Sequence, residues 1–191
     1  VDAIEFDVHL TSDNHLVVMH DKDTRRVALK KAVIRKKTLV ELKRLKLKNG
    51  QAIPTLNEAL TAIGEIPVII ELKNNDSVEV LLATLDMHPK AKISVASFQH
   101  GELERLRDER PDIPLYVLEH FSPIEIINSA LHIGATGIGL NMCLMNPLTY
   151  RMAKQFNLEL YVYTVNNRLI GHFYRWLYPT VVLCTDHPER F

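Results

Sequence analysis

Apolar and polar residues alternate along two short segments near the start of the chain. The segments are 4–8 (IEFDV) and 16–20 (LVVMH), and a cluster of turn-forming residues separates them. Alternation of this kind is typical of β-strands, so the pattern predicts a β-hairpin. A two-residue tip at Asp13 and Asn14 makes the paired residue numbers sum to about 27.

This hairpin would gather reactive groups on one face. Glu5 and Asp7 project to the same side, because alternate side chains of a strand share a face, and the two-residue tip places Asp7 opposite His20. Neighbouring carboxylates repel each other, so the arrangement favours a bound cation. The hairpin alone fits equally well the solvent-facing side of an edge strand with no functional role.

The rest of the chain alternates strand and helix patterns with short connections. Capping boxes that begin at Thr38 and Thr55 predict two short helices, and Ser122 and Pro123 predict the cap and first turn of a later one. Further strands are predicted at 67–73, 92–97, 115–118, 136–140, 158–165 and 181–185, and further helices at 77–87, 100–110, 146–156 and 167–177. Seven strands in this alternation predict an α/β fold with a parallel sheet and helices outside it.

An open doubly wound sheet and a closed barrel both fit this alternation. Polar residues recur where the predicted strands end, at Asp7, Lys73, Ser97, Asn141, Asn166 and Asp186. The catalytic groups of a (β/α)8 TIM barrel collect at that end of its strands, so we favour the barrel.

Composition narrows the class of protein. The chain has 191 residues, of which 47% are hydrophobic and 24% charged, so we expect one globular domain over 1–191. The formal net charge is zero, which gives no reason to expect a nucleic-acid partner. No apolar run approaches the roughly 20 residues of a membrane span and no signal peptide is visible, so a cytoplasmic location is expected. The oligomeric state does not follow from the sequence.

Three motifs, taken in chain order, resemble the glycerophosphodiester phosphodiesterase family of the phosphatidylinositol-phospholipase-C-like superfamily. They are Glu5-Phe6-Asp7, His20-Asp21 and Glu71-Leu72-Lys73, and the agreement continues through 53–60 (IPTLNEAL), 97–98 (SF), 163–166 (YTVN) and 185–188 (TDHP). Each motif is weak alone, but together they follow the family's order along essentially the whole chain. The resemblance implies a (β/α)8 barrel and a phosphoric diester hydrolase.

The sequence departs from the family pattern at its first residues. Family members begin with a strand that ends in a His-Arg-Gly motif, which supplies a catalytic histidine and a phosphate-binding arginine. Residues 4–8 already match the family's second strand, and the chain is shorter than a barrel of about 250 residues by roughly one βα unit. We therefore expect that this first unit is missing from the sequence, and that residues 1–191 alone have almost no activity.

The carboxylates in these motifs also predict a metal site. Glu5, Asp7 and Glu71 supply hard oxygen ligands of the kind that Mg²⁺ and Ca²⁺ prefer. Such a cation would bind a phosphate oxygen and a glycerol hydroxyl and neutralise charge during hydrolysis. The expected products are an alcohol and glycerol 3-phosphate, formed from a small-molecule glycerophosphodiester.

Three further residues are candidates for catalysis or substrate binding. Lys73 shares the face of Glu71 and is expected to hold a second phosphate oxygen or to steady a metal ligand. Histidine exchanges protons near neutral pH, and by the resemblance His20 forms an acid-base pair with the family histidine that this chain lacks. Asn166, in the 163–166 motif, is expected to bind substrate. His9 lies closer to the turn than Asp7, and we predict that it is solvent-exposed.

Two other classes of function remain open. A Schiff-base aldolase would also use a lysine on a barrel strand, and Lys73 could be that lysine. The carboxylates near it argue against this alternative, because they would keep the amine protonated. A non-catalytic barrel that binds phosphate is the second alternative.

Overall fold

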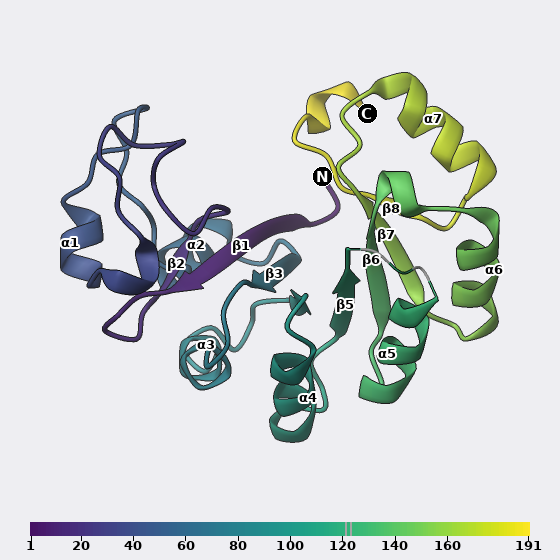
Figure 1. Ribbon diagram of the computed structural model, residues 1–191, viewed down its shortest axis with the longest axis horizontal. Helices are drawn as coiled ribbons and strands as arrows, with labels where there is room; N and C mark the ends of the chain where they lie inside the picture. The colour runs from purple at the N-terminus through teal and green to yellow at the C-terminus, as the bar shows by residue number, and fades with distance from the viewer. Residues whose placement is uncertain (121, 123) are drawn as a thin grey trace. The chain divides into compact units, whose positions relative to one another are not determined.

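The computed structural model describes residues 1–120, 122 and 124–191 (Figure 1). Its contacts divide the chain into two compact units, Asp2–Ser94 and Val95–Phe191, with Val1 assigned to the second. The proline predicted in a first helical turn, Pro123, lies outside the described residues. The units are described in turn, because each has its own packing.

Strands of the first unit bring two acidic segments together. Strand β1 (Ile4–Leu10) pairs antiparallel with β2 (Leu16–Val18) and parallel with β3 (Val68–Leu72). Both of these strands were predicted, and β3 is a buried apolar strand that ends in charge, as the sequence indicated. In the register of β1 and β3, Asp7 lies beside Glu71.

The hairpin register predicted from the sequence is wrong by one residue. Val8 pairs with Val18, whereas the prediction paired it with Met19. Asp7 therefore lies opposite Met19, whose N–H donates to the Asp7 carbonyl at 2.9 Å. A shift of one residue moves side chains to the other face of a strand, so Asp7 and His20 are not cross-strand partners.

The loop at the hairpin tip explains the shift. Thr11 N–H donates to the carbonyl of His15 at 2.9 Å, which leaves three residues in the loop instead of two. Asn14, the last of them, has a φ of 58°. A three-residue hairpin loop commonly places a left-handed residue at this position, and asparagine tolerates that conformation.

The end of β2 and the residues between β2 and β3 form a small apolar core of their own. Two short helices, α1 (Leu39–Lys43) and α2 (Leu56–Ile63), begin at the predicted capping boxes. The buried cluster contains Val17, Met19, Ala32, Ile34, Leu42 and Ile53. Because two of its members flank the end of β2, this core supports the segment that carries His20.

The cap of α2 provides a test of local stability. Thr55 Oγ1 accepts from Glu58 N–H at 3.1 Å, and Glu58 Oε2 accepts from Thr55 N–H at 2.8 Å. We expect Thr55→Ala to lower the free energy of unfolding by about 1 kcal/mol, because it leaves a helix N-terminal donor without its partner. Urea denaturation would measure the loss. Thr61→Ala is the control, because this exposed threonine is inside the same helix, and an equal loss in both variants would contradict the prediction.

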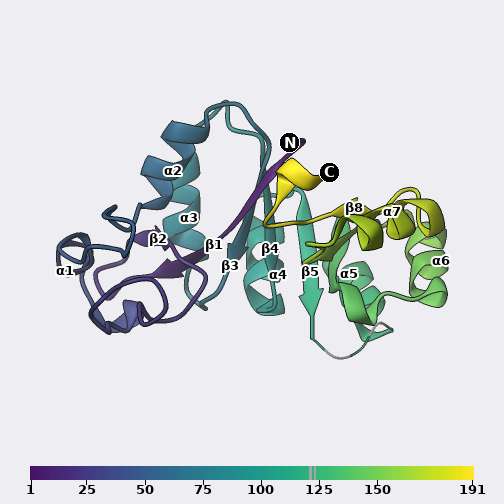
Figure 2. The ribbon, with the colours of Figure 1, turned by 90° about the horizontal axis from the view of Figure 1, so that it is seen from above.

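The second unit continues the predicted alternation of parallel strands and helices (Figures 1 and 2). Helix α3 (Val78–Leu85) is the last helix of the first unit. Strand β4 (Ile93–Ser97) follows it and crosses the boundary between the units. Then follow α4 (His100–Glu109), β5 (Leu115–Glu119), α5 (Glu125–Ile133), β6 (Gly137–Asn141), α6 (Pro147–Gln155), β7 (Glu159–Tyr163), α7 (Arg168–Leu177) and β8 (Val182–Leu183). Short 3₁₀ helices occupy Ile34–Lys36, Met142–Leu144 and Pro188–Arg190.

Strand order distinguishes between the two predicted architectures. Among the described residues the order is β2-β1-β3-β4-β5-β6-β7-β8, and β4 to β8 pair in parallel. From β1 onward each parallel strand therefore lies beside the next one in the chain. A doubly wound sheet reverses its strand order at a switch point, whereas the winding of a barrel does not. The topology agrees with the barrel prediction.

None of the helices among the described residues has the length and apolar content needed to cross a lipid bilayer.

Candidate active site

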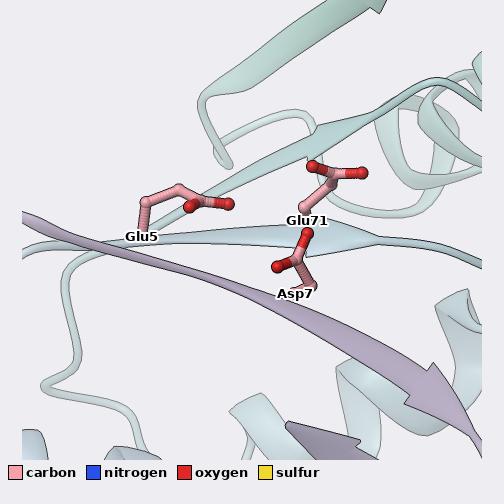
Figure 3. A group of neighbouring side chains, drawn as sticks. All are labelled: Glu5, Asp7 and Glu71. Atoms are coloured by element: carbon pink, nitrogen blue, oxygen red, sulfur yellow. The ribbon is translucent and has the colours of Figure 1, made fainter. Parts of the chain in front are cut away.

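Three carboxylates of the first unit meet on one face of its sheet. Glu5 and Asp7 project from β1 and Glu71 from β3 (Figure 3). One ligand oxygen from each of these side chains lies within 4.8 Å of the others. Alternation along β1 and its parallel register with β3 produce this arrangement, so the predicted grouping of the three side chains is confirmed.

Lys73 lies in direct contact with two of these acids. Its Nζ is 2.7 Å from Asp7 Oδ1 and also forms an ion pair with Glu71 Oε1. Burial lowers the pKa of Lys73, but the charges of Glu71 and Asp7 outweigh that effect and hold the pKa above its ordinary value. The ammonium group is therefore charged and next to the carboxylates, as predicted.

Glu71 is the one acid of the three that is buried. It is buried at the end of β3, and burial raises the pKa of Glu71 to about 7 despite the opposing effect of Lys73. The proximity of Asp7 raises it further. A bound cation would stabilise the charged form of these acids.

The geometry of the three acids suits a single hard cation. Carboxylate oxygens bind Ca²⁺ at 2.3–2.6 Å and Mg²⁺ at 2.0–2.1 Å, so two ligands on opposite sides of one ion are about 5 Å apart around Ca²⁺ and about 4 Å apart around Mg²⁺. The 4.8 Å span of Glu5, Asp7 and Glu71 lies within the limit for Ca²⁺, and Mg²⁺ would require the oxygens to move closer together. Their donor atoms are oxygens, which suit Mg²⁺ and Ca²⁺ better than they suit softer metals.

His20 follows the hairpin, and its position corrects the sequence prediction. Its side chain is 66% exposed, and Nδ1 lies 2.9 Å from Asp21 Oδ1. Asp21 also accepts from Arg26 Nε at 2.7 Å. His20 does not face Asp7 across the hairpin, but it comes directly after Met19, which bonds to Asp7 through the backbone.

His9 was predicted to be exposed, and the structure contradicts this. The residue is 6% exposed, and its ring contacts the side chain of Asn74 and the backbone of His20. Burial lowers the pKa of His9, although its hydrogen-bond neighbours oppose the shift. The alternation of β1 placed His9 on the face of Asp7, but the sequence did not identify Asn74 as its partner, because that contact joins residues far apart in the chain.

Asn166 belongs to the second unit. Its Oδ1 accepts from Thr185 Oγ1 at 3.1 Å and from Asp186 N–H at 3.0 Å, while its Nδ2 donates to Asp186 Oδ2 at 2.9 Å. These bonds join the ends of β7 and β8, where we predicted polar residues. Substrate binding by Asn166 stays a prediction.

Comparison with known proteins identifies the family. The model of the "Glycerophosphoryl diester phosphodiesterase family" matches residues 1–190. The chain belongs to this family. Family membership confirms the resemblance seen in the sequence, together with the enzyme class of phosphoric diester hydrolase.

Individual relatives agree with the family assignment. A glycerophosphodiester phosphodiesterase of Bacillus subtilis (strain 168) is 27% identical over 222 residues, a match that covers 100% of this chain and 75% of the relative. A protein of the same name from Caldanaerobacter subterraneus is 24% identical over 182 residues, covering 87% of this chain and 75% of that one.

Solved structures confirm the predicted fold class. A glycerophosphodiester phosphodiesterase from Parabacteroides distasonis has a TM-score of 0.84 at 26% identity, covering 99% of this chain and 81% of that chain. An Oleispira antarctica phosphodiesterase, solved in complex with the product sn-glycerol-3-phosphate, has a TM-score of 0.92 at 20% identity. That match covers 100% of this chain and 83% of the other, so the α/β barrel fold of the family extends along the whole chain.

Proposed function

We propose that this protein hydrolyses glycerophosphodiesters to an alcohol and glycerol 3-phosphate, with Mg²⁺ or Ca²⁺ held by Glu5, Asp7 and Glu71. The cluster of three carboxylates beside Lys73, in a chain of this family, is the observation that carries the proposal. The product bound to the Oleispira antarctica phosphodiesterase supports glycerol 3-phosphate as the product here.

Each residue has a distinct part in the proposed reaction. The cation, when bound, neutralises negative charge on the phosphoryl group. Lys73 carries a positive charge beside the carboxylates and holds a phosphate oxygen or orients Asp7. His20, exposed at the end of the hairpin, transfers a proton to or from the reacting oxygens. Substrate binding by Asn166 is proposed from its place in the 163–166 motif.

The environment of Lys73 weighs against the aldolase alternative. Formation of a Schiff base requires a neutral amine. The carboxylates of Asp7 and Glu71 instead hold the pKa of Lys73 above its ordinary value. A phosphodiesterase uses a charged lysine directly, so the observed environment favours hydrolysis.

Removal of divalent cations tests the proposal. We expect EDTA to lower the hydrolysis of glycerophosphocholine by the intact protein at least about 100-fold, because loss of a metal that stabilises transition-state charge costs several kcal/mol. A coupled assay for glycerol 3-phosphate would measure the rate and identify the product. Restoration of activity by Mg²⁺ or by Ca²⁺ added separately would identify the effective ion. Unchanged hydrolysis in EDTA would contradict the metal assignment, and binding of phosphate without turnover would favour the non-catalytic barrel.

A further inference from the structure

His9 is a buried imidazole that joins the end of one strand to the segment carrying His20. Its Nδ1 lies 3.1 Å from Asn74 Oδ1, and its Nε2 lies 3.2 Å from the carbonyl oxygen of His20. Leu10 N–H donates to the same oxygen of Asn74 at 2.9 Å, which determines the orientation of that amide. The ring therefore has one contact at the end of β3 and the other on the backbone of His20.

The His20 backbone lies just beyond the paired residues of the hairpin. Strand β2 ends at Val18, and Met19 donates one more hydrogen bond, to the Asp7 carbonyl. At the next residue the partner of the main-chain carbonyl is the His9 side chain. The His20 imidazole itself is 66% exposed and contacts the adjacent Asp21 at 2.9 Å, so the position of this backbone determines where the ring and its Asp21 partner lie.

Both ring nitrogens face oxygen atoms, and a neutral imidazole has one N–H. We propose that His9 is a positioning residue whose proton lies on Nε2 and is donated to the His20 carbonyl, which leaves the contact with Asn74 without a proton. The inference rests on the proton-transfer role of His20 in the proposed function. His9 itself does not need to touch the substrate. A displacement of about 1 Å in a catalytic group can cost about 10²-fold in rate, so the loss of this contact should reduce turnover.

Two amide substitutions separate the contacts of the ring. The glutamine amide nitrogen reaches about as far as Nε2 of histidine, so His9→Gln retains a donor for the His20 carbonyl. The shorter asparagine side chain places its amide near the position of Nδ1, so His9→Asn retains a polar group for Asn74 and loses the contact with His20. Both variants put an uncharged polar side chain at the same buried position.

We expect His9→Asn to lower kcat for glycerophosphocholine about 10- to 100-fold, with KM and the affinity for Mg²⁺ unchanged. His9→Gln should restore kcat to within a few-fold of the parent. The ring resonances of His20 in NMR spectra should shift in His9→Asn and stay near their original positions in His9→Gln. Equal kcat values in two folded variants, or a lower Mg²⁺ affinity that accounts for the loss, would overturn the proposal.

A double-mutant cycle with His20→Ala distinguishes this inference from the proposed function. If His9 acts through His20, His9→Asn should have no further effect on kcat once the His20 imidazole is gone. An undiminished effect in that background would overturn the positioning role while leaving the role of His20 intact. If His20→Ala alone leaves kcat unchanged, the proposed proton-transfer role fails first, and the inference about His9 fails with it.

Discussion

We expect Glu71→Gln to lower phosphodiesterase activity of the intact protein about 10³-fold. The substitution keeps the size of the side chain but removes one of three carboxylates that surround the proposed cation. Metal stabilisation of transition-state charge is worth several kcal/mol, and each 1.36 kcal/mol is tenfold in rate. The fold should survive, because Lys73 keeps its ion pair with Asp7 at 2.7 Å.

Stability measurements separate loss of metal from loss of structure. Binding to the folded state alone stabilises a protein by about 2.7 kcal/mol at a ligand concentration of 100 times Kd. Saturating Mg²⁺ or Ca²⁺ should therefore raise Tm in the parent and have little effect on Glu71→Gln. Glu65→Gln is the control, because Glu65 is an exposed glutamate of the same unit. If Glu71→Gln retains full activity and the metal-dependent rise in Tm, Glu71 is not a ligand.

The contribution of Glu71 to folding stability should change with pH in a defined direction. Burial raises the pKa of Glu71 to about 7, whereas a glutamate in an unfolded chain ionises near pH 4.3. The folded state therefore binds this proton more tightly, and the contribution of Glu71 to stability falls as the pH rises from about 4 to 7. In EDTA at pH 8, Glu71→Gln should have a Tm equal to or higher than that of the parent. In the parent, metal affinity should weaken below about pH 7, because the proton competes with the cation.

We expect His20→Ala to lower kcat about 10²- to 10⁴-fold, the usual contribution of a general acid or base. Protein folding and metal affinity should change little, because the imidazole is 66% exposed and its hydrogen bond is to Asp21 at the surface. Steady-state assays with glycerophosphocholine would give kcat, and calorimetric titration with Mg²⁺ would give the affinity.

His132→Ala is the matched control for this experiment. His132 lies on α5 with its side chain 78% exposed, so its removal tests the general effect of deleting a surface histidine. The control should retain the activity of the parent. A loss of only a few-fold in His20→Ala, or a loss equal to that of the control, would assign proton transfer to another group.

Local sequence signals were sufficient to predict most of the elements. Thr38 and Thr55, each followed three residues later by glutamate, begin helices where the capping boxes indicated. The apolar run at 67–73 forms β3 within a parallel sheet. These signals depend on neighbours in the chain, so the sequence carries them directly.

The carboxylate cluster could also be predicted, because two simple regularities produce it. Alternation places Glu5 and Asp7 on one face of β1, and Glu71 ends a strand predicted to lie parallel to it. The register of β1 and β3 then brings Asp7 beside Glu71. No knowledge of individual side-chain contacts was needed for this part of the site.

The sequence by itself determined the strand and helix alternation, the motifs of the family and the acids of the proposed metal site. Only the tertiary structure decided the hairpin register, because a left-handed Asn14 admits a third loop residue that composition does not reveal. It also decided that His9 is buried, since its contact with Asn74 spans 65 residues of the chain. Periodicity assigns a side chain to a face of its strand, but the partner that covers it comes from a distant segment, and chain folding alone selects that partner.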